Sequence, residues 1–543
     1  MVATTLYDGF ADMADRYPDA TALEVRQLAL TYRELREAAL ALATWILTEH
    51  SGTAPTTVGL LADHSAPAYV GYLAAQRLGA AVVPLNPRFP LEGNIERARL
   101  ASAEVVLADR SSGGGKFHDE ANHFRPTVIE LADPDVVALA RCGGLPPYTA
   151  RPEDVAYILF TSGSTGRPKG VPIRQRNLQP WLRNMINRYQ TRPGIRFSQN
   201  CDLSFDASLF FFAAWWSGGT VVVPQNADLM SPADYAADKR ITHWFLVPSI
   251  VDIAQRLGTL DERSASRLLR YSVFGGEQLT LQHSETWLRV FPRTEIDNGY
   301  GPTELTITCA SYRLPGDPGD RPRTSNGAVP IGQVYPYLEH VVLDESGHAA
   351  AEGELCVRGS QRFDGYLDPS DNADRFVIFD GIRAIPHEGG PVSPRHWYRT
   401  GDVVRTEQGQ LLCLGRLDDQ VKVSGYRVEL GEVETAVRRH LGAAQAVAIA
   451  LTSPGGSSVL AVAHTGEALD AQDAIRRLRA HLPVHAIPRR FLPLTELPVN
   501  VNGKVDRWRI TQMFEASDGA GNGPQTSSGL LSTGDRRHSV ADI

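Results

Sequence analysis

Short apolar runs alternate with helix-like segments along the part of the chain before residue 327. One helix is expected after Thr31-Tyr-Arg-Glu34, a capping box in which the threonine hydroxyl accepts a backbone N–H and the glutamate reaches back. A second helical segment covers residues 69–78. The strand-like runs, many of them ended by Gly, Pro or Asn, cover residues 57–61, 81–85, 105–108, 155–160, 220–223, 244–247 and 271–274. This alternation predicts an α/β fold with parallel sheets that are covered by helices on both faces.

The apolar pattern changes after about Gly327. Short strand-like runs at 340–343, 353–358 and 410–414 follow one another closely, which predicts an antiparallel or barrel-like piece over residues 327–415. The sequence Gly-Arg-Leu-Asp-Asp at 415–419 then has the character of a joint between two units.

Beyond this joint, strand-like runs at 446–451 and 459–463 and a helical run at 471–482 predict a separate, small α+β unit. We therefore expect an N-terminal core at 1–417 and a C-terminal domain at 418–511. Residues 512–543 are rich in Gly, Ser, Thr, Asp and Gln and cannot bury enough apolar surface to order themselves. We expect them to form a disordered tail.

Length, charge and cysteine content narrow the class of protein. A chain of 543 residues is too long for one domain. Its net charge of −8 gives no general attraction to nucleic acid or to anionic membranes. The longest apolar run, residues 209–216, is far shorter than the about 20 residues that a spanning helix needs, and no signal peptide begins the chain. Five scattered cysteines without a CxxC pair fit a reducing compartment, so we expect a cytoplasmic protein.

The densest chemical motif follows the strand-like run at 155–160. It reads Thr-Ser-Gly-Ser-Thr-Gly-Arg-Pro-Lys, and its candidate phosphate-binding residues are Thr161, Ser162, Gly163, Ser164, Thr165, Gly166 and Lys169. Glycines let backbone amides approach an anion, hydroxyls donate to phosphate oxygens, and the lysine adds a positive charge. It is not a Walker loop, because Lys169 is followed by Gly170 and the glycine spacing differs.

This loop resembles the signature of the adenylate-forming superfamily, which includes nonribosomal peptide adenylation domains, acyl-CoA synthetases and luciferases. Further motifs of that superfamily follow in order, at residues 298–304 (Asn-Gly-Tyr-Gly-Pro-Thr-Glu), 398–402 (Tyr-Arg-Thr-Gly-Asp), 415–429 and 498–504. The resemblance implies a large N-terminal domain with two parallel-type α/β sheet layers and a small β-barrel-like subdomain. It also implies a small, mobile α+β C-terminal domain.

The resemblance implies a role for each matching residue. Tyr300 would stack on adenine, Thr303 would touch the α-phosphate, and Glu304 would help to hold Mg²⁺. Asp402 would accept hydrogen bonds from the ribose hydroxyls. The remaining implied residues are Gly275, Asn298, Gly299 and Arg416 at the nucleotide, Asp418 at the hinge, Gly425 at a tunnel for a pantetheine arm, and Lys504 as the mobile catalytic lysine.

Residues 204–208 (Ser-Phe-Asp-Ala-Ser) resemble the motif of amino-acid-activating members. Asp206 would pair with the substrate ammonium, because a carboxylate in an apolar pocket needs a cation; a helix-capping aspartate is the alternative. By the same resemblance the pocket would be lined by Ala207, Phe210, Phe245, Val273, Gly275, Gly299, Ile307 and Thr308. No second charge occurs among them, which favours a small to medium apolar amino acid with an α- or a β-amine.

The implied reaction has two steps. ATP and an amino acid form aminoacyl-AMP with Mg²⁺ as cofactor, and the C-terminal domain then turns about Asp418 so that a thiol can take the aminoacyl group. No carrier-like segment follows Lys504 and no condensation domain precedes residue 1, so we expect a discrete carrier protein with a phosphopantetheine arm as partner. The alternatives are an acyl-CoA or aryl-CoA ligase that uses coenzyme A, and a nucleotide-binding regulator without catalysis.

Overall fold

A computed structural model describes residues 5–121, 124–141, 150–161, 167–261, 266–418, 420–423, 425–452, 458–499 and 505–519. Its first sheet has six strands in the order β6-β5-β3-β4-β7-β8, parallel except for the antiparallel pair β7–β8. The strands are β3 (Thr57–Leu61), β4 (Ala81–Leu85), β5 (Val105–Asp109), β6 (Thr127–Leu131), β7 (Val155–Thr161) and β8 (Lys169–Arg174). Helices α3 (Ala66–Leu78), α4 (Leu91–Leu100), α5 (Gly114–Glu120), α6 (Asp133–Leu139) and α7 (Gln175–Arg188) accompany them. The predicted strand runs of this region are therefore confirmed.

The second sheet has nine strands in the order β15-β14-β13-β12-β11-β9-β10-β1-β2. They are β1 (Thr21–Val25), β2 (Leu28–Thr31), β9 (Arg196–Ser198), β10 (Thr220–Val223), β11 (His243–Leu246), β12 (Tyr271–Phe274), β13 (Glu295–Tyr300), β14 (Ala310–Arg313) and β15 (Gln333–Val334). The central strands run parallel, and β2, β14 and β15 are antiparallel to their neighbours. Its helices are α1 (Leu6–Arg16), α2 (Tyr32–Glu49), α8 (Phe211–Trp215), α9 (Asn226–Met230), α10 (Pro232–Asp238), α11 (Ser249–Leu257) and α12 (Leu281–Val290).

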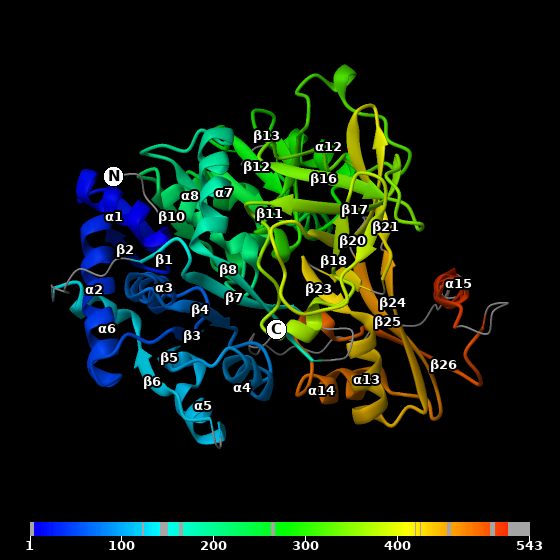
Figure 1. The fold of residues 1–543 in the computed structure, drawn as a ribbon, viewed down its shortest axis with the longest axis horizontal. Helices are drawn as coiled ribbons and strands as arrows, with labels where there is room; N and C mark the ends of the chain where they lie inside the picture. The colour runs from blue at the N-terminus through cyan, green and yellow to red at the C-terminus, as the bar shows by residue number, and fades with distance from the viewer. Residues whose placement is uncertain are drawn as a thin grey trace, which may run out of the picture.

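The two sheets share one core. Its largest cluster of buried apolar residues takes members from both sheets and from α2, α3 and α8, and aromatic contacts such as Phe10–Trp215 and Tyr69–Phe211 lie within it. The predicted capping box begins α2, because Thr31 Oγ1 accepts the Glu34 amide at 3.2 Å and Glu34 Oε2 accepts the Thr31 amide at 2.9 Å. Figure 1 shows these N-terminal layers in blue to green. The expected pair of α/β sheet layers is confirmed.

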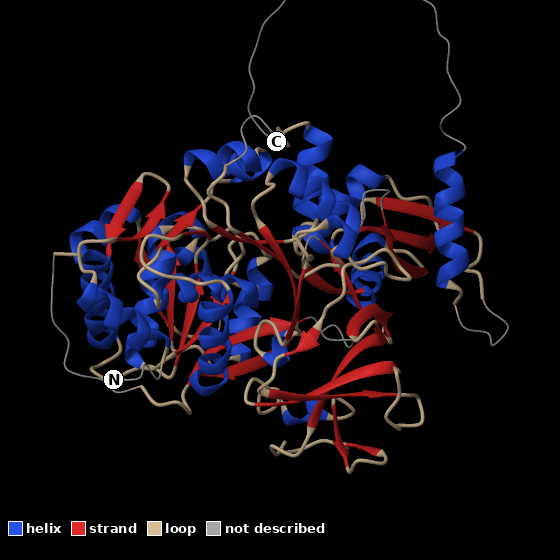
Figure 2. Ribbon diagram, turned by 90° about the horizontal axis from the view of Figure 1, so that it is seen from above, coloured by secondary structure: helices blue, strands red, loops and turns tan. Residues whose placement is uncertain are grey.

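The region after Gly327 forms an antiparallel sheet, as predicted, but its described strands do not close into a barrel. They are β16 (Leu338–Leu343), β17 (Glu352–Gly359), β18 (Phe376–Phe379), β19 (Ala384–Pro386), β20 (Trp397–Glu407) and β21 (Gln410–Arg416). The 11-residue strand β20 is long enough to pair with β17 along one edge and with both β18 and β21 along the other. β16 and β19 therefore remain at the edges, and the barrel-like expectation is corrected to an open, branched sheet (Figure 2).

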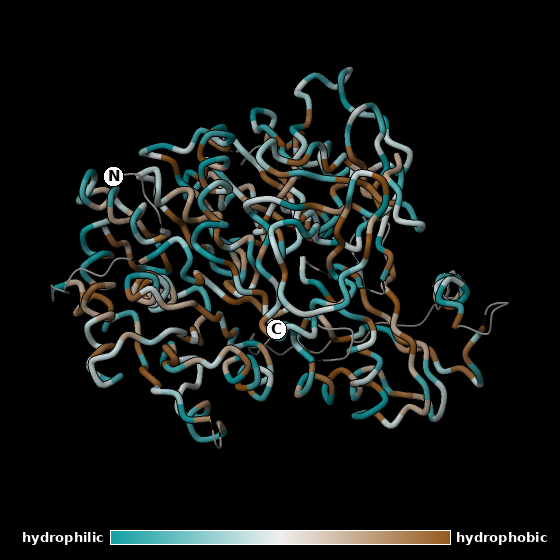
Figure 3. Tube along the Cα trace, in the orientation of Figure 1, coloured by the Kyte–Doolittle hydropathy of each residue, from teal (hydrophilic) through white to brown (hydrophobic). Residues whose placement is uncertain are grey.

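The C-terminal part begins with the hairpin of β22 (Gln420–Val423) and β23 (Tyr426–Glu429). It continues with α13 (Leu430–Leu441), β24 (Gln445–Thr452), β25 (Ser458–Thr465), α14 (Ala471–Leu478), β26 (Arg490–Leu494) and α15 (Arg507–Gly519). The helix expected at 471–482 ends at Leu478. Strands β24, β25 and β26 form their own sheet, and α13, α14 and this sheet bury a separate apolar cluster. The trace in Figure 3 shows hydrophobic residues along these strands in brown. Within the described ranges, no helix combines the length and the apolar character required to cross a bilayer.

The expected start of the tail at residue 512 is wrong. Residues up to Gly519 belong to α15, because Ile510 and Phe514, four residues apart on one helix face, are buried against β24 and β25. Residues 520–543 lie outside the described part of the chain.

This packing makes a prediction about α15. Replacing Phe514, which is 2% exposed, with alanine should destabilise the C-terminal part by about 3 kcal/mol, since a buried phenylalanine contributes that much to a core. Hydrogen exchange of the β24 amides measures this local stability. The matched variant Met513→Ala, at a position that is 36% exposed, should change it by less than about 0.5 kcal/mol. Equal effects of the two substitutions would contradict the packing.

Candidate active site

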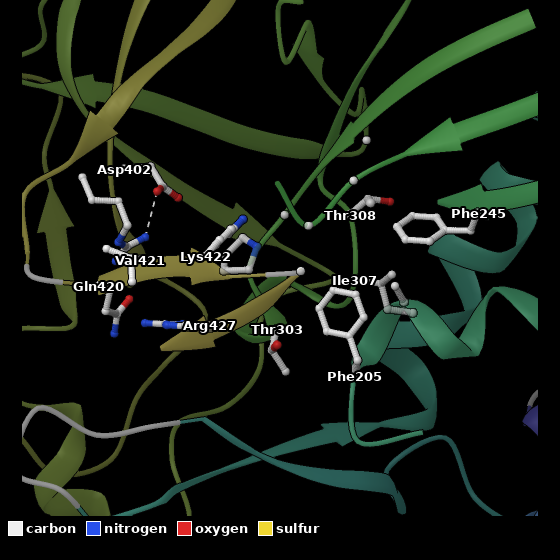
Figure 4. Close-up of a pocket in the computed structure, with 18 residues that line it drawn as sticks. Phe205, Phe245, Thr303, Ile307, Thr308, Asp402, Gln420, Val421, Lys422 and Arg427 are labelled. Carbon is white, nitrogen blue, oxygen red and sulfur yellow. Dashed lines mark hydrogen bonds and ion pairs between the residues drawn. The ribbon is translucent and has the colours of Figure 1, made fainter. Parts of the chain in front are cut away.

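A cavity lies where the ends of β11, β12 and β13 face the β22–β23 hairpin (Figure 4). We call it the inner cavity; it encloses about 60 Å³. Its walls are formed by Phe205, Ala207, Phe245, Gly275, Gly276, Gly299, Gly301, Pro302, Thr303, Ile307, Thr308, Asp402, Arg416, Gln420, Val421, Lys422, Gly425 and Arg427. Figure 4 shows the hairpin residues on one wall, with Phe245, Ile307 and Thr308 opposite. The fold thus brings together predicted residues from four separate motifs.

A second cavity of about 390 Å³, the outer cavity, adjoins the first and shares Gly299, Asp402, Arg416 and Lys422 with it. It adds three of the residues that were matched to nucleotide binding and the hinge, namely Asn298, Tyr300 and Asp418. Asn298 is held in place by hydrogen bonds from its Nδ2 to the carbonyl oxygens of Val329 and Pro330, at 3.0 and 2.9 Å.

A chain of hydrogen bonds and ion pairs connects the residues matched to adenine, ribose and hinge. The Tyr300 hydroxyl donates to Asp402 Oδ2 at 2.6 Å, and Arg416 Nη1 donates to Asp402 Oδ1 at 2.8 Å. Arg416 also contacts both carboxylate oxygens of Asp418, at 2.6 and 2.9 Å. Burial raises the pKa of Asp418, but the Arg416 guanidinium lowers this pKa by more than burial raises it. The pKa therefore lies below its usual value, and the carboxylate is charged.

Glu304 is fully buried on the short 3₁₀ turn η3 (Thr303–Leu305). Its Oε1 accepts the Tyr366 hydroxyl at 2.8 Å, and Arg427 Nη1 lies 3.2 and 3.3 Å from its two oxygens. Burial raises the pKa of Glu304, but the Arg427 guanidinium and the neighbouring tyrosine hydroxyls bring it below its ordinary value. The sequence analysis missed Arg427 and Tyr366, although Arg427 belongs to the motif that was matched at 415–429.

Only the two ends of the predicted phosphate loop are described. Thr161 ends β7, Lys169 begins β8, and the two residues face each other in the antiparallel pair. Lys169 Nζ pairs with Asp371 at 3.0 Å and lies 5.5 Å from the ring centroid of Tyr366, which in turn contacts Glu304. The loop therefore begins and ends close to Glu304. Ser162, Gly163, Ser164, Thr165, Gly166 and Lys504 lie outside the described residues.

Asp206 is the first residue of the 3₁₀ helix η2 (Asp206–Phe210), not its N-cap, which is Phe205. It is 5% exposed, and its Oδ2 has no hydrogen-bond partner among the described residues. Burial raises the pKa of Asp206 to about 7. Its neighbours Phe205 and Ala207 line the inner cavity, whereas Asp206 itself is not among the lining residues.

The other predicted pocket residues fall into two layers. Ala207, Phe245, Gly275, Gly299, Ile307 and Thr308 line the inner cavity, whereas Phe210 and Val273 are buried behind it. The Phe210 ring lies 4.8 Å from the Phe245 ring and 4.9 Å from Trp181, so it supports the wall. Thr308 Oγ1 accepts hydrogen bonds from Trp181 Nε1 and the Tyr335 hydroxyl, both at 2.9 Å.

The backbone of this wall is strained. Thr306 and Ile307 have φ values of 60° and 72°, a left-handed conformation that β-branched residues rarely adopt. Gln361 holds the segment, because its Nε2 donates to the carbonyl oxygens of Leu305, Thr306 and Thr308 at 2.8–3.1 Å. No local sequence signal points to Gln361, which is more than fifty residues away along the chain.

Comparisons with known proteins agree with this geometry. The family model described as AMP-binding enzyme matches residues 10–367. Phosphinothricin tripeptide synthetase PhsC of Streptomyces viridochromogenes is 35% identical over 96% of this chain, and the chain spans about half of that relative's length (46%). Tyrocidine synthase 3 of Brevibacillus parabrevis is 31% identical over 93% of the chain, which covers 8% of that protein.

Two solved structures cover nearly the whole chain. The crystal structure of IdnL7 is 36% identical with a TM-score of 0.67, over 95% of this chain and 99% of that one. The Vibrio cholerae adenylation domain AlmE, solved in complex with glycyl-adenosine-5′-phosphate, is 26% identical with a TM-score of 0.79, over 95% and 98%. The chain thus belongs to the AMP-binding enzyme family, in the adenylate-forming superfamily, and is an AMP-forming ligase that resembles the adenylation domains of nonribosomal peptide synthetases.

Proposed function

We propose that this enzyme activates a small apolar amino acid as aminoacyl-AMP and passes it to the phosphopantetheine thiol of a discrete carrier protein. The observation that carries the amino-acid assignment is Asp206, a buried carboxylate with an unpartnered oxygen next to the cavity wall. A buried carboxylate is stable as an anion only with a cationic partner, and a substrate ammonium supplies one. AlmE, a structural relative, was solved with an aminoacyl-adenylate of glycine.

In the proposed first step, a carboxylate oxygen of the amino acid attacks the α-phosphorus of ATP. A new P–O bond forms to the amino acid, the bond to the β-phosphate oxygen breaks, and pyrophosphate leaves. The protein forms no covalent bond, so catalysis depends on positioning and on charge neutralisation. Tyr300 and Asp402 would hold the adenosine, while Thr303, Lys169 and Lys504 would contact the phosphates.

The described residues fit a magnesium ion that arrives with ATP. No group of three or more His, Cys, Asp or Glu side chains gathers in the described part of the chain, so the protein does not provide a complete metal site there. Glu304 instead offers one buried carboxylate, and magnesium commonly takes one or two carboxylates together with phosphate oxygens and water. When bound, the ion would neutralise triphosphate charge.

In the proposed second step, the thiolate sulfur attacks the acyl carbon of the adenylate, and AMP leaves as the C–O bond breaks. Gly425 lines the inner cavity with φ +83°, and a Cβ there would lie 2.7 Å from Val247 Cγ1. A glycine thus lets the hairpin pack closely against Val247 at the cavity, where the acyl group would lie in the proposed function. Relatives that contain carrier domains include PA1221, described as containing adenylation and PCP domains and 25% identical to this chain.

The wall of the inner cavity favours a small apolar side chain. The Phe245 ring and Ile307 occupy its far side, and the Thr308 hydroxyl is bound to Trp181 and Tyr335. Phe245 in turn rests on Phe210 and cannot move back without displacing a buried ring. The predicted pocket residues that line this cavity carry no charge that could meet a charged side chain; they are Ala207, Phe245, Gly275, Gly299, Ile307 and Thr308.

The role of Asp206 predicts both an activity loss and a pH effect. Asp206→Asn should lower kcat/KM for the amino acid at least about a hundredfold, since breaking a buried ion pair costs about 3–5 kcal/mol. In the wild type, kcat/KM should fall about tenfold per pH unit below pH 7, because burial raises the pKa of Asp206 to about 7 and the protonated acid cannot pair with an ammonium. Amino-acid-dependent pyrophosphate release measures both.

The matched control is Asp252→Asn, a buried aspartate that pairs with His283 at 3.1 Å outside these cavities. It should leave the pH profile unchanged. An acid limb that persists in Asp206→Asn, or wild-type activity that is flat between pH 5.5 and 7, would refute the assignment.

The wall also predicts a change of preference. Phe245→Ala should raise the leucine-to-alanine ratio of kcat/KM at least tenfold, because the removed ring leaves room for a branched side chain and each methylene fitted in an apolar pocket is worth about 1–3 kcal/mol. The control Phe291→Leu removes aromatic volume from a separate core cluster and should not alter the ratio. A ratio that stays constant in Phe245→Ala would mean that Phe245 does not limit substrate size.

A further inference from the structure

The ion pair between Glu304 and Arg427 joins the two parts of the enzyme. Glu304 follows β13 in the N-terminal part, and Arg427 lies on β23, after the hinge candidate Asp418. One guanidinium nitrogen lies 3.2 and 3.3 Å from the two carboxylate oxygens, and the carboxylate has no exposure to solvent. Figure 4 shows Arg427 extending from the hairpin beside Thr303. This pair exists only while the hairpin is docked as it is here.

Other hairpin contacts fix the position of Arg427. The Gly425 amide donates to Glu277 Oε1 at 2.8 Å, and the Tyr426 hydroxyl donates to Asp202 Oδ2 at 3.0 Å. Tyr426 also stacks on His485 with the ring centroids 3.8 Å apart. Arg427 follows directly in the chain, so these contacts hold its guanidinium against Glu304.

Glu304 is also the residue whose carboxylate fits the ion that accompanies ATP in the proposed function. In the structure, Glu304 Oε1 also accepts a hydrogen bond from the Tyr366 hydroxyl, but this neutral donor cannot balance a buried negative charge. A guanidinium and a divalent cation at this one carboxylate would repel each other in a water-poor site, so the electrostatics favour one cationic partner over two. Glu304 therefore has one cationic partner at a time.

We propose that Arg427 and the divalent cation of ATP are alternative partners of Glu304, so that the docked hairpin and metal-bound ATP exclude each other. This inference rests on the proposed function. It makes Arg427 a positioning residue: it supplies the positive charge that Glu304 needs once the ion and pyrophosphate have left, and so stabilises the arrangement in which Gly425 faces the acyl group. Before the next ATP binds, Arg427 must withdraw.

The test compares ATP binding with and without magnesium. Calorimetric titration with α,β-methylene-ATP, which cannot lose pyrophosphate, gives one Kd in EDTA and one in Mg²⁺. We call the Kd in EDTA divided by the Kd in Mg²⁺ the metal ratio. Arg427→Gln should raise the metal ratio at least fivefold over the wild type, because the ion no longer displaces a guanidinium, and should change Kd in EDTA less than twofold. Arg427→Lys keeps a cation and should stay within twofold of the wild-type metal ratio.

Tyr426→Phe is the matched control, because it removes a docking hydrogen bond of the same hairpin without touching Glu304. Its metal ratio should remain within twofold of the wild type. A metal ratio in Arg427→Gln that equals the wild type, or an equally large rise in Tyr426→Phe, would overturn the proposal. Melting temperatures of all variants verify that they fold.

Glu304→Gln separates this inference from the proposed function. Its metal ratio should fall close to one, and adding Arg427→Gln to it should have no further effect, because the carboxylate for which Arg427 and the cation compete is already absent. If Glu304→Gln keeps the wild-type metal ratio, the metal role of Glu304 in the proposed function is wrong. If the metal ratio of Glu304→Gln falls close to one while that of Arg427→Gln equals the wild-type value, only the proposed exchange of Arg427 for the cation is wrong.

Discussion

The cleft of this enzyme depends on the pairing of buried carboxylates with cations, because a buried charge without a partner is strongly destabilising. Arg416 meets Asp402 and Asp418, and Arg427 meets Glu304. Asp206 is buried to a similar degree, yet one of its oxygens has no hydrogen-bond partner among the described residues. In the proposed function, this carboxylate oxygen is the position that receives the ammonium of the substrate.

The pairs differ in what they connect. Arg416, Asp402 and Asp418 are close in sequence and join the end of the antiparallel sheet to the hinge candidate. Arg427 and Glu304 are 123 residues apart and join the two parts of the enzyme across the cleft. In the proposed exchange, a turn of the C-terminal part would break the second pair, and Glu304 would then need another cation. Domain movement and ligand charge would thereby be coupled through one buried carboxylate.

Local patterns in the sequence predicted much of the fold and failed where distant segments meet. The capping box at Thr31, four strands of the six-stranded sheet and three central strands of the nine-stranded sheet depend on neighbouring residues and were predicted. The open edge of the antiparallel sheet depends on the length of β20, and the helical start of the expected tail depends on Ile510 and Phe514 packing against β24 and β25. Neither is visible in composition.

In the candidate site, too, residues within a local motif could be predicted from the sequence, whereas residues contributed by distant segments could not. The motifs matched by resemblance located Tyr300, Asp402 and Arg416, which meet in the fold as expected. The supports of the site, such as Gln361 beneath the strained wall at Ile307, come from elsewhere in the chain and carry no motif. Asp206 was proposed as an anchor from its motif, but only the structure shows that it is buried with an oxygen that has no hydrogen-bond partner among the described residues.

Amino-acid-dependent exchange of labelled pyrophosphate into ATP tests the pairing of Asp206 with a substrate ammonium most directly. Glycine, alanine and β-amino acids of similar size would be compared with their des-amino analogues, acetate, propionate and butyrate. We predict exchange with at least one amino acid that exceeds its des-amino analogue about a hundredfold, since the analogue leaves a buried carboxylate unpaired. Equal exchange with amino acids and des-amino acids would contradict it and favour an acyl-CoA ligase.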